Sequence, residues 1–73
     1  MEKQKYIRTK DGEIIIFPST IEHSRFKYLN PVTAGFCFIN ENKVECLGMS
    51  FSLNLISNPE EDSKHATCQI FGE

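Results

Sequence analysis

The residues with the clearest chemical potential are three cysteines and a histidine in the second half of the chain. If the segments on either side of residues 40–43 pair as a hairpin, Cys37 lies directly opposite Cys46. These thiols could form a cross-strand disulfide, or half of a zinc site completed by His65 and Cys68. The C-x-x-C pairs of zinc knuckles are absent, and free cysteine usually packs as a small apolar residue. Plain packing is the simplest interpretation, zinc and a disulfide are the alternatives, and no cofactor is expected.

A second group with catalytic residue types is Glu22, His23 and Ser24. Adjacent residues on a helix point in different directions, so this acid, base and nucleophile cannot converge as a triad does. His23 is therefore predicted to be an exposed helix residue. The sequence also lacks a phosphate-binding loop, a dinucleotide fingerprint, an EF-hand loop and an H-E-x-x-H motif. These observations predict that the protein is not an enzyme.

Basic residues are concentrated at the start of the chain. Residues 1–27 carry six basic and four acidic side chains, whereas residues 28–73 carry two basic and six acidic ones. A pI near 5.6 argues against nucleic-acid binding as the main activity. If nucleic acid is bound, the expected contacts are Lys5, Arg8, Lys10, Arg25 and Lys27.

The length of 73 residues predicts one small domain spanning residues 1–73. Such a domain buries only about 60% of its unfolded surface, so small folds often gain stability by self-association or by binding a metal. No segment approaches the roughly 18 apolar residues of a membrane helix, and the N-terminus lacks an apolar signal-peptide core. We therefore expect a cytoplasmic protein with reduced thiols and no membrane contact.

The first predicted element of the fold is a β-hairpin that turns at Asp11-Gly12. Asp-Gly favours a two-residue turn, which pairs Ile7 with Ile16. In that register one face carries apolar side chains that the two short helices cannot cover, and we predict it to be a contact patch. The residues of this predicted patch are Tyr6, Ile15 and Phe17.

A short helix is predicted next, because Ser19 and Glu22 have the spacing of a capping box. It runs from Ser19 to about Leu29, where Asn30-Pro31 stops it.

Residues 44–55 carry the strongest alternation of apolar and polar positions, which predicts a long strand with one buried face. Pairing it with residues 34–39 places Phe36 opposite Leu47. Gly48 marks a bend or bulge in this strand. The predicted core face then consists of Ala34, Phe36, Phe38, Leu47, Met49, Phe51, Leu53 and Leu55.

The last predicted element is a helix from Asn58, its N-cap, to about Phe71, with Ala66 and Ile70 facing inward. The acidic residues 60–62 fit its first turn, where the helix dipole favours negative charge. Residues 66–71 also alternate well enough to form a strand, so both structures stay open for that segment.

Together these elements predict an α+β fold, with two β-hairpins forming one small antiparallel sheet, a short helix between them and a C-terminal helix. The predicted function is that of a small non-enzymatic interaction or regulatory protein that self-associates, as a homodimer, through its surface patch. The alternatives are a nucleic-acid-associated regulator that uses the basic N-terminal segment, and a small zinc-stabilised domain.

Two stretches also carry a resemblance: Lys10–Pro18 with Ile21–Phe26, and Met49–Leu53 leading into Pro59–Ser63. In them the chain resembles small uncharacterised proteins encoded by prophages and other mobile elements of gut bacteria. The resemblance implies a bacterial or phage cytoplasmic setting, and it carries over no catalytic or binding residue.

Overall fold

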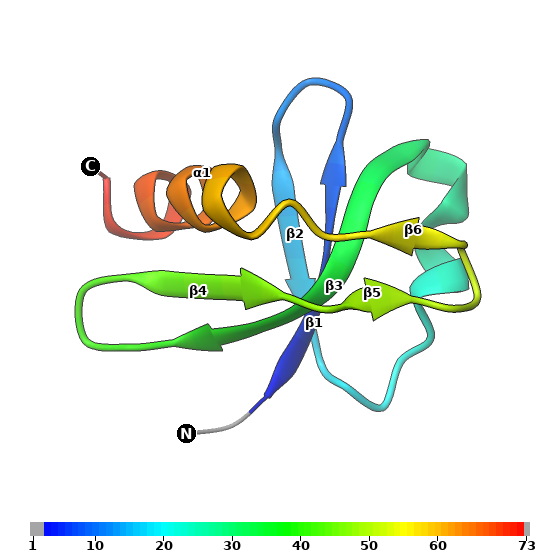
Figure 1. Cartoon of the computed structure of the whole chain (residues 1–73), viewed down its shortest axis with the longest axis horizontal. Helices are drawn as coiled ribbons and strands as arrows, with labels where there is room; N and C mark the ends of the chain where they lie inside the picture. The colour runs from blue at the N-terminus through cyan, green and yellow to red at the C-terminus, as the bar shows by residue number, and fades with distance from the viewer. Residues whose placement is uncertain (1–2, 73) are drawn as a thin grey trace.

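The computed structural model describes residues 3–72 and has the α+β architecture that the sequence predicts. Within this range the chain forms strands, a 3-10 helix and an α-helix (Figure 1). Their order is β1 Gln4–Thr9, β2 Ile14–Phe17, η1 His23–Leu29, β3 Pro31–Ile39, β4 Val44–Leu47, β5 Met49–Ser50, β6 Leu55–Ile56 and α1 Pro59–Phe71.

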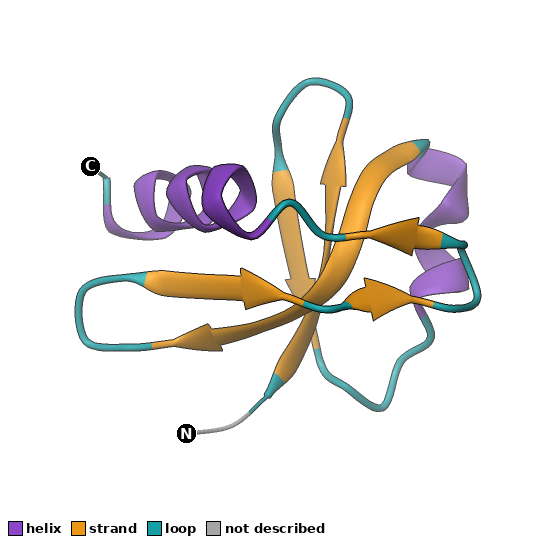
Figure 2. Cartoon of the chain, viewed as in Figure 1, coloured by secondary structure: helices purple, strands orange, loops and turns teal. Residues whose placement is uncertain are grey.

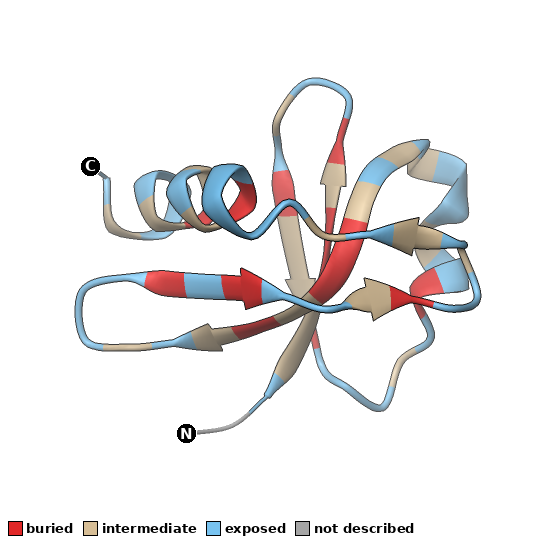
Figure 3. Cartoon of the chain, viewed as in Figure 1, coloured by how far each residue is buried: buried red, intermediate tan, exposed pale blue. Residues whose placement is uncertain are grey.

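The centre of the fold is a four-stranded antiparallel sheet with strand order β2-β1-β3-β4 (Figure 2). Helix α1 packs on one face, where the core is formed by Tyr6, Ile14, Cys37, Val44, Cys46 and Ala66. On the other face, η1 and the β5–β6 hairpin cover a second core formed by Ile7, Phe17 and Ala34. Buried residues accordingly lie on all four strands of the main sheet and on the side of α1 that faces it (Figure 3).

The first hairpin has a three-residue loop, so the predicted two-residue turn is wrong. Thr9 N–H donates to Glu13 O at 2.9 Å, and Gly12 has a φ of 92°. Glycine at positive φ commonly closes a three-residue loop as well as a two-residue turn. Asp-Gly is therefore compatible with more than one loop length. The observed register pairs Ile7 with Ile15, one residue away from the prediction.

This shift divides the predicted contact patch between the two faces of the sheet. Tyr6 lies on the α1 face, whereas Ile15 and Phe17 lie on the opposite face. Tyr6 and Phe17 are also buried. These three side chains therefore form no common surface, because a one-residue slip moves every side chain of one strand to the other face.

The register of the second hairpin is confirmed: Phe36 pairs with Leu47, and Cys37 pairs with Cys46. The prediction of one long strand over residues 44–55 is wrong. The strand ends at Leu47, because Gly48 takes a φ of 86° and redirects the chain into β5. A turn over residues 51–54 then leads into β6, which pairs with β5.

The predicted core face is only partly correct. Ala34 is buried, and Leu53 and Leu55 pack against the cluster to which it belongs, but Leu47 and Phe51 are exposed. Phe36, Phe38 and Met49 are half-buried. The reason is that α1 covers the other face of β3 and β4, so the buried side chains there are Cys37, Val44 and Cys46.

Helix η1 begins at His23, so the predicted start at Ser19 is wrong. Glu22 is the N-cap and makes no side-chain capping bond, while residues 19–20 lie in a turn after Pro18. The predicted end at Leu29 is confirmed, and Asn30 takes a left-handed conformation there.

Helix α1 matches its prediction closely. Asn58 Oδ1 accepts a hydrogen bond from Glu61 N–H at 3.4 Å, and Gly72 caps the C-terminus with a φ of 76°. Residues 66–71 are helical, which excludes the strand alternative. Ala66 faces inward as predicted, whereas Ile70 is exposed, and the other buried residue of the helix is Asp62. Among the described residues, neither helix has the length and apolar composition needed to span a bilayer.

Polar side chains of α1 close both edges of the main sheet. On β4, Val44 N–H donates to Thr67 Oγ1 at 2.9 Å, and Cys46 N–H donates to Ser63 Oγ at 2.8 Å. The spacing of the two acceptors along α1 matches that of the two donors along β4, because four helical residues rise about 6 Å and two strand residues about 6.8 Å. On β2, the Gln69 amide bonds both backbone groups of Ile14. Outward backbone groups of Ile14, Val44 and Cys46, which could otherwise attract another strand, are thus occupied on both edges.

Candidate functional site

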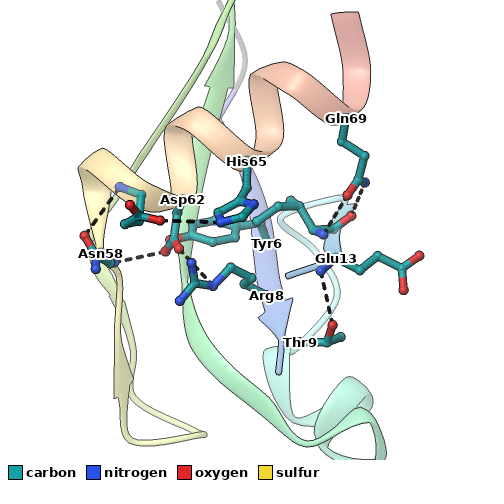
Figure 4. Close-up of polar contacts among 10 residues, drawn as sticks. Tyr6, Arg8, Thr9, Glu13, Asn58, Asp62, His65 and Gln69 are labelled. Carbon is teal, nitrogen blue, oxygen red and sulfur yellow. Dashed lines mark hydrogen bonds and ion pairs between the residues drawn. The ribbon is translucent and has the colours of Figure 1, made fainter. Parts of the chain in front are cut away.

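The most polar part of the interior is centred on the carboxylate of Asp62 (Figure 4). Asp62 Oδ2 accepts hydrogen bonds from the Tyr6 hydroxyl and from Asn58 N–H, the latter at 2.9 Å. Arg8 Nε lies 3.3 Å from Asp62 Oδ1 and forms an ion pair without hydrogen-bond geometry. The Asp62 side chain is fully buried, and that of Arg8 is 17% exposed.

These contacts make the cluster a structural connection between α1 and β1. Burial, followed by the hydrogen bond to Asp62, raises the pKa of the Tyr6 hydroxyl far above its usual value. Tyr6 therefore remains protonated and donates to the carboxylate. Since Asp62 is fully buried and contacted on both oxygens, it is poorly placed to act on a substrate. Sequence reasoning assigned Asp62 to the helix dipole, although its spacing of four from Ala66 indicates the buried face of the helix.

The four cysteine and histidine candidates do not converge. Cys37 and Cys46 are opposed and buried, whereas Cys68 is exposed and lines a groove together with Cys46. The His65 ring lies against Gly12 and 3.4 Å from Glu61. Within residues 3–72, no three His, Cys, Asp or Glu residues are grouped as metal ligands.

The basic candidates for nucleic-acid contact do not share one surface. Lys5 and Arg8 lie on opposite faces of β1. Lys5 Nζ donates to Ile21 O at 3.0 Å, and Arg8 pairs with the buried Asp62. Lys10 belongs to the first hairpin loop, while Arg25 and Lys27 belong to η1.

His23 is buried, so the prediction of an exposed residue is wrong. Its Nε2 lies 2.8 Å from Gly35 O, and because a carbonyl only accepts, Nε2 carries the proton. The ring meets Phe17 and Phe36 edge-on, with centroids 5.5 and 5.8 Å away. Burial is the largest of the effects that lower the pKa of His23.

We expect the free energy of unfolding to fall as the pH drops below about 6.5, the pKa of an unperturbed histidine. The unfolded chain then binds a proton at His23 that the folded chain resists, because the folded-state pKa is lower. This contribution is complete above the unfolded pKa and is lost as the pH falls through the folded pKa. Urea unfolding between about pH 7 and pH 5 measures the slope.

His23→Gln should flatten that slope, since glutamine can still donate to Gly35 O but does not titrate. His65→Gln is the matched control and should retain it, because the substitution leaves His23 and its bond to Gly35 O in place. Parallel pH profiles for the wild type and His23→Gln would contradict the assignment.

Exposed and half-buried apolar side chains form a strip across β3, β4 and the β5–β6 hairpin. Phe36 and Leu47 are partners across the β3–β4 ladder, and Met49 and Ile56 are partners across β5–β6. Phe36, Met49 and Phe51 line one hollow of about 300 Å³, which joins the two parts. Phe51 is 87% exposed, Ile56 68% and Leu47 44%. The strip consists of Phe36, Phe38, Leu47, Met49, Phe51 and Ile56.

Charges of opposite sign border this strip. On the β1 side, Lys3 Nζ lies 4.5 Å from the centre of the Phe36 ring, and Lys5 is the β1 partner of Phe36. On the β4 side, Glu45 is the partner of Phe38 and pairs with Lys43 at 3.7 Å. The alternation of these apolar residues is visible in the sequence, but there it predicted a core face rather than an exposed strip.

Comparison with known proteins identified no relative. No protein-family model, curated protein or solved structure matches the chain.

Proposed function

We propose that this chain is a small non-enzymatic interaction protein that forms a homodimer through the apolar strip. The observation that supports this proposal is the exposure of Phe51, Ile56 and Leu47 on one continuous surface with three half-buried apolar side chains. Contiguous apolar surface of this kind marks protein contacts in soluble proteins. A bacterial or phage cytoplasmic setting belongs to the same proposal and rests on the sequence resemblance alone.

The charges at the borders favour a second copy as the partner. In a two-fold interface the same surface meets itself in reversed orientation. A two-fold axis through the strip would bring Lys3 of one copy towards Glu45 of the other, which in the single chain pairs with the exposed Lys43. The arrangement joins apolar side chains at the centre to opposite charges at the rim, as specific interfaces do.

The size of the molecule also fits this partner. The chain exposes 4772 Å², and a stable interface takes about 800 Å² from each partner. The strip and its charged borders thus need to contribute about one sixth of the surface. Since α1 side chains bond outward backbone groups on both edges of the main sheet, we expect the contact to use side chains rather than an added strand.

We expect the double variant Leu47→Asp/Phe51→Asp to be a folded monomer at concentrations where the wild type is a dimer. Both side chains are exposed in the monomer, so the variant should keep its circular dichroism spectrum, while two desolvated carboxylates should weaken association at least about a hundredfold. Sedimentation equilibrium from about 1 to 200 μM measures the dimer dissociation constant.

Tyr28→Asp is the matched control, because Tyr28 is 74% exposed but lies on η1, outside the strip. It should dimerise like the wild type. A wild type that stays monomeric throughout this range, or a double variant that dimerises equally well, would refute the proposed interface.

A further inference from the structure

Cys37 and Cys46 face each other at a position where an antiparallel ladder makes no hydrogen bond between partners. Asn40 N–H donates to Lys43 O at 2.8 Å, which fixes the hydrogen-bonded pairs of this hairpin. The cysteine pair lies out of phase with them. Cys46 N–H supports this assignment independently, because it points away from β3 and donates to Ser63 Oγ at 2.8 Å. Partners at such positions have Cα atoms about 4.5 Å apart, the shorter of the two ladder spacings.

Both thiols point to the α1 face and pack in the same core cluster. Disulfides join residues whose Cα atoms are about 4.4–6.8 Å apart, and the ladder spacing falls within that range. Closing the bond thus requires rotation of two side chains rather than a new backbone position. We propose that Cys37 and Cys46 are a latent redox site, which a small-molecule disulfide such as oxidised glutathione converts into a cross-strand disulfide.

The reaction consists of two exchange steps. The Cys46 thiolate attacks one sulfur of the oxidised reagent, forms a mixed disulfide and releases the first reagent thiolate. The Cys37 thiolate then attacks Cys46 Sγ, which releases the second reagent thiolate. The two protons lost by the cysteines appear on the two released thiols. The protein is oxidised by two electrons, and one reagent disulfide is reduced to two thiols.

Burial controls the rate of this conversion. It raises the pKa of Cys37 to about 11 and that of Cys46 to about 12, the latter with smaller contributions from the neighbouring Cys37 and Asp62. Only the thiolate attacks, so exchange is slow at neutral pH. Cys46 lines an open groove of about 800 Å³ between β4 and α1, which gives the reagent its approach. The rate should therefore rise with pH and with local opening of α1.

Cys68 is the competing thiol, because it is exposed and lines the same groove. In an unfolded chain, loop closure favours Cys37–Cys46 over Cys46–Cys68 only modestly. Their separations are 9 and 22 residues, which predicts a ratio of about fourfold. If the refolded chain forms Cys37–Cys46 over Cys46–Cys68 in a ratio well above this value, the fold has brought Cys37 and Cys46 together.

The test is to refold the reduced full chain in a glutathione redox buffer near pH 8, so that burial does not limit the approach to equilibrium. After acid quenching and alkylation, trypsin separates the cysteines into peptides 28–43, 44–64 and 65–73. Mass spectrometry then counts each linked pair. A parallel sample kept in concentrated urea gives the unfolded ratio, and Cys68→Ser is the control that removes the competitor.

We expect the peptides 28–43 and 44–64 to be linked at least about tenfold more often than 44–64 and 65–73, against about fourfold in urea. Cys68→Ser should form the bridge to the same extent. Equal ratios with and without urea, or mixed glutathione adducts in place of the bridge, would overturn the proposal.

The bridged form should also unfold at a higher temperature, by roughly 5–15 °C, because the disulfide restrains the unfolded chain. This inference is independent of the dimer, since the cysteines lie on the α1 face and the paired Phe36 and Leu47 lie on the other. Cys68→Ser scanned in the oxidised and reduced states isolates the shift. A bridged protein that melts no higher than the reduced one would contradict the inference that the native backbone accommodates the bond.

Discussion

Asp62→Ala is expected to cost about 3–5 kcal/mol of unfolding free energy, enough to leave a domain of this size largely unfolded. The substitution removes the acceptor of the Tyr6 hydroxyl and of Asn58 N–H at once. It also leaves the guanidinium of Arg8, with only 17% of the side chain exposed, without its counter-charge. Urea unfolding followed by circular dichroism measures the loss.

Glu61→Ala is the matched control, because Glu61 is the preceding acid of the same helix turn but is half-exposed. It should change stability little. The double variant Asp62→Ala/Arg8→Met should recover part of the loss, since an apolar side chain replaces the unpaired charge. If Asp62→Ala unfolds within about 1 kcal/mol of the wild type, the buried cluster is not what holds α1 on the sheet.

Gly35→Ala is expected to cost about 3 kcal/mol or more, because the centre of the sheet has no room for a methyl group. A Cβ at this position would meet the carbonyl oxygen of Leu47 closer than any real contact, with Gly48 C at 3.3 Å. Both atoms are backbone and cannot rotate away. The junction between β4 and β5 would have to move off β3, and thermal unfolding should detect the change.

Gly72→Ala is the control that separates space from backbone conformation. Gly72 has a φ of 76° and no atom within 4 Å of an added Cβ, so alanine there should cost only about 1 kcal/mol of left-handed strain. Similar losses at both positions would contradict the steric argument for Gly35.

The sequence predicts local structure well where a cap or turn motif is compatible with only one backbone conformation. Asn58-Pro59 at the start and Gly72 at the end define α1. The second hairpin follows from its turn and from its alternating pattern, which agree on one register. By contrast, Asp11-Gly12 fits loops of different lengths, and the choice between them decides the face on which Tyr6 lies.

The covered face of a strand depends on contacts made elsewhere in the chain. The alternation in residues 44–55 correctly indicates two unlike faces, but α1 covers the side of Cys46 rather than that of Leu47. The same long-range packing buries His23 and Asp62, two polar residues that local patterns assign to the surface. Their roles therefore appear only with the tertiary structure.

The closure of both sheet edges by α1 has a consequence for the order of events during synthesis. Helix α1 follows every strand in the chain, so a ribosome delivers the complete sheet before the residues that occupy its edges. In that interval the outward backbone groups of Val44, Cys46 and Ile14 have no partner, and two nascent chains on one messenger can pair through them. Any condition that delays the docking of α1 would lengthen this exposure and increase insoluble product without altering a single native contact.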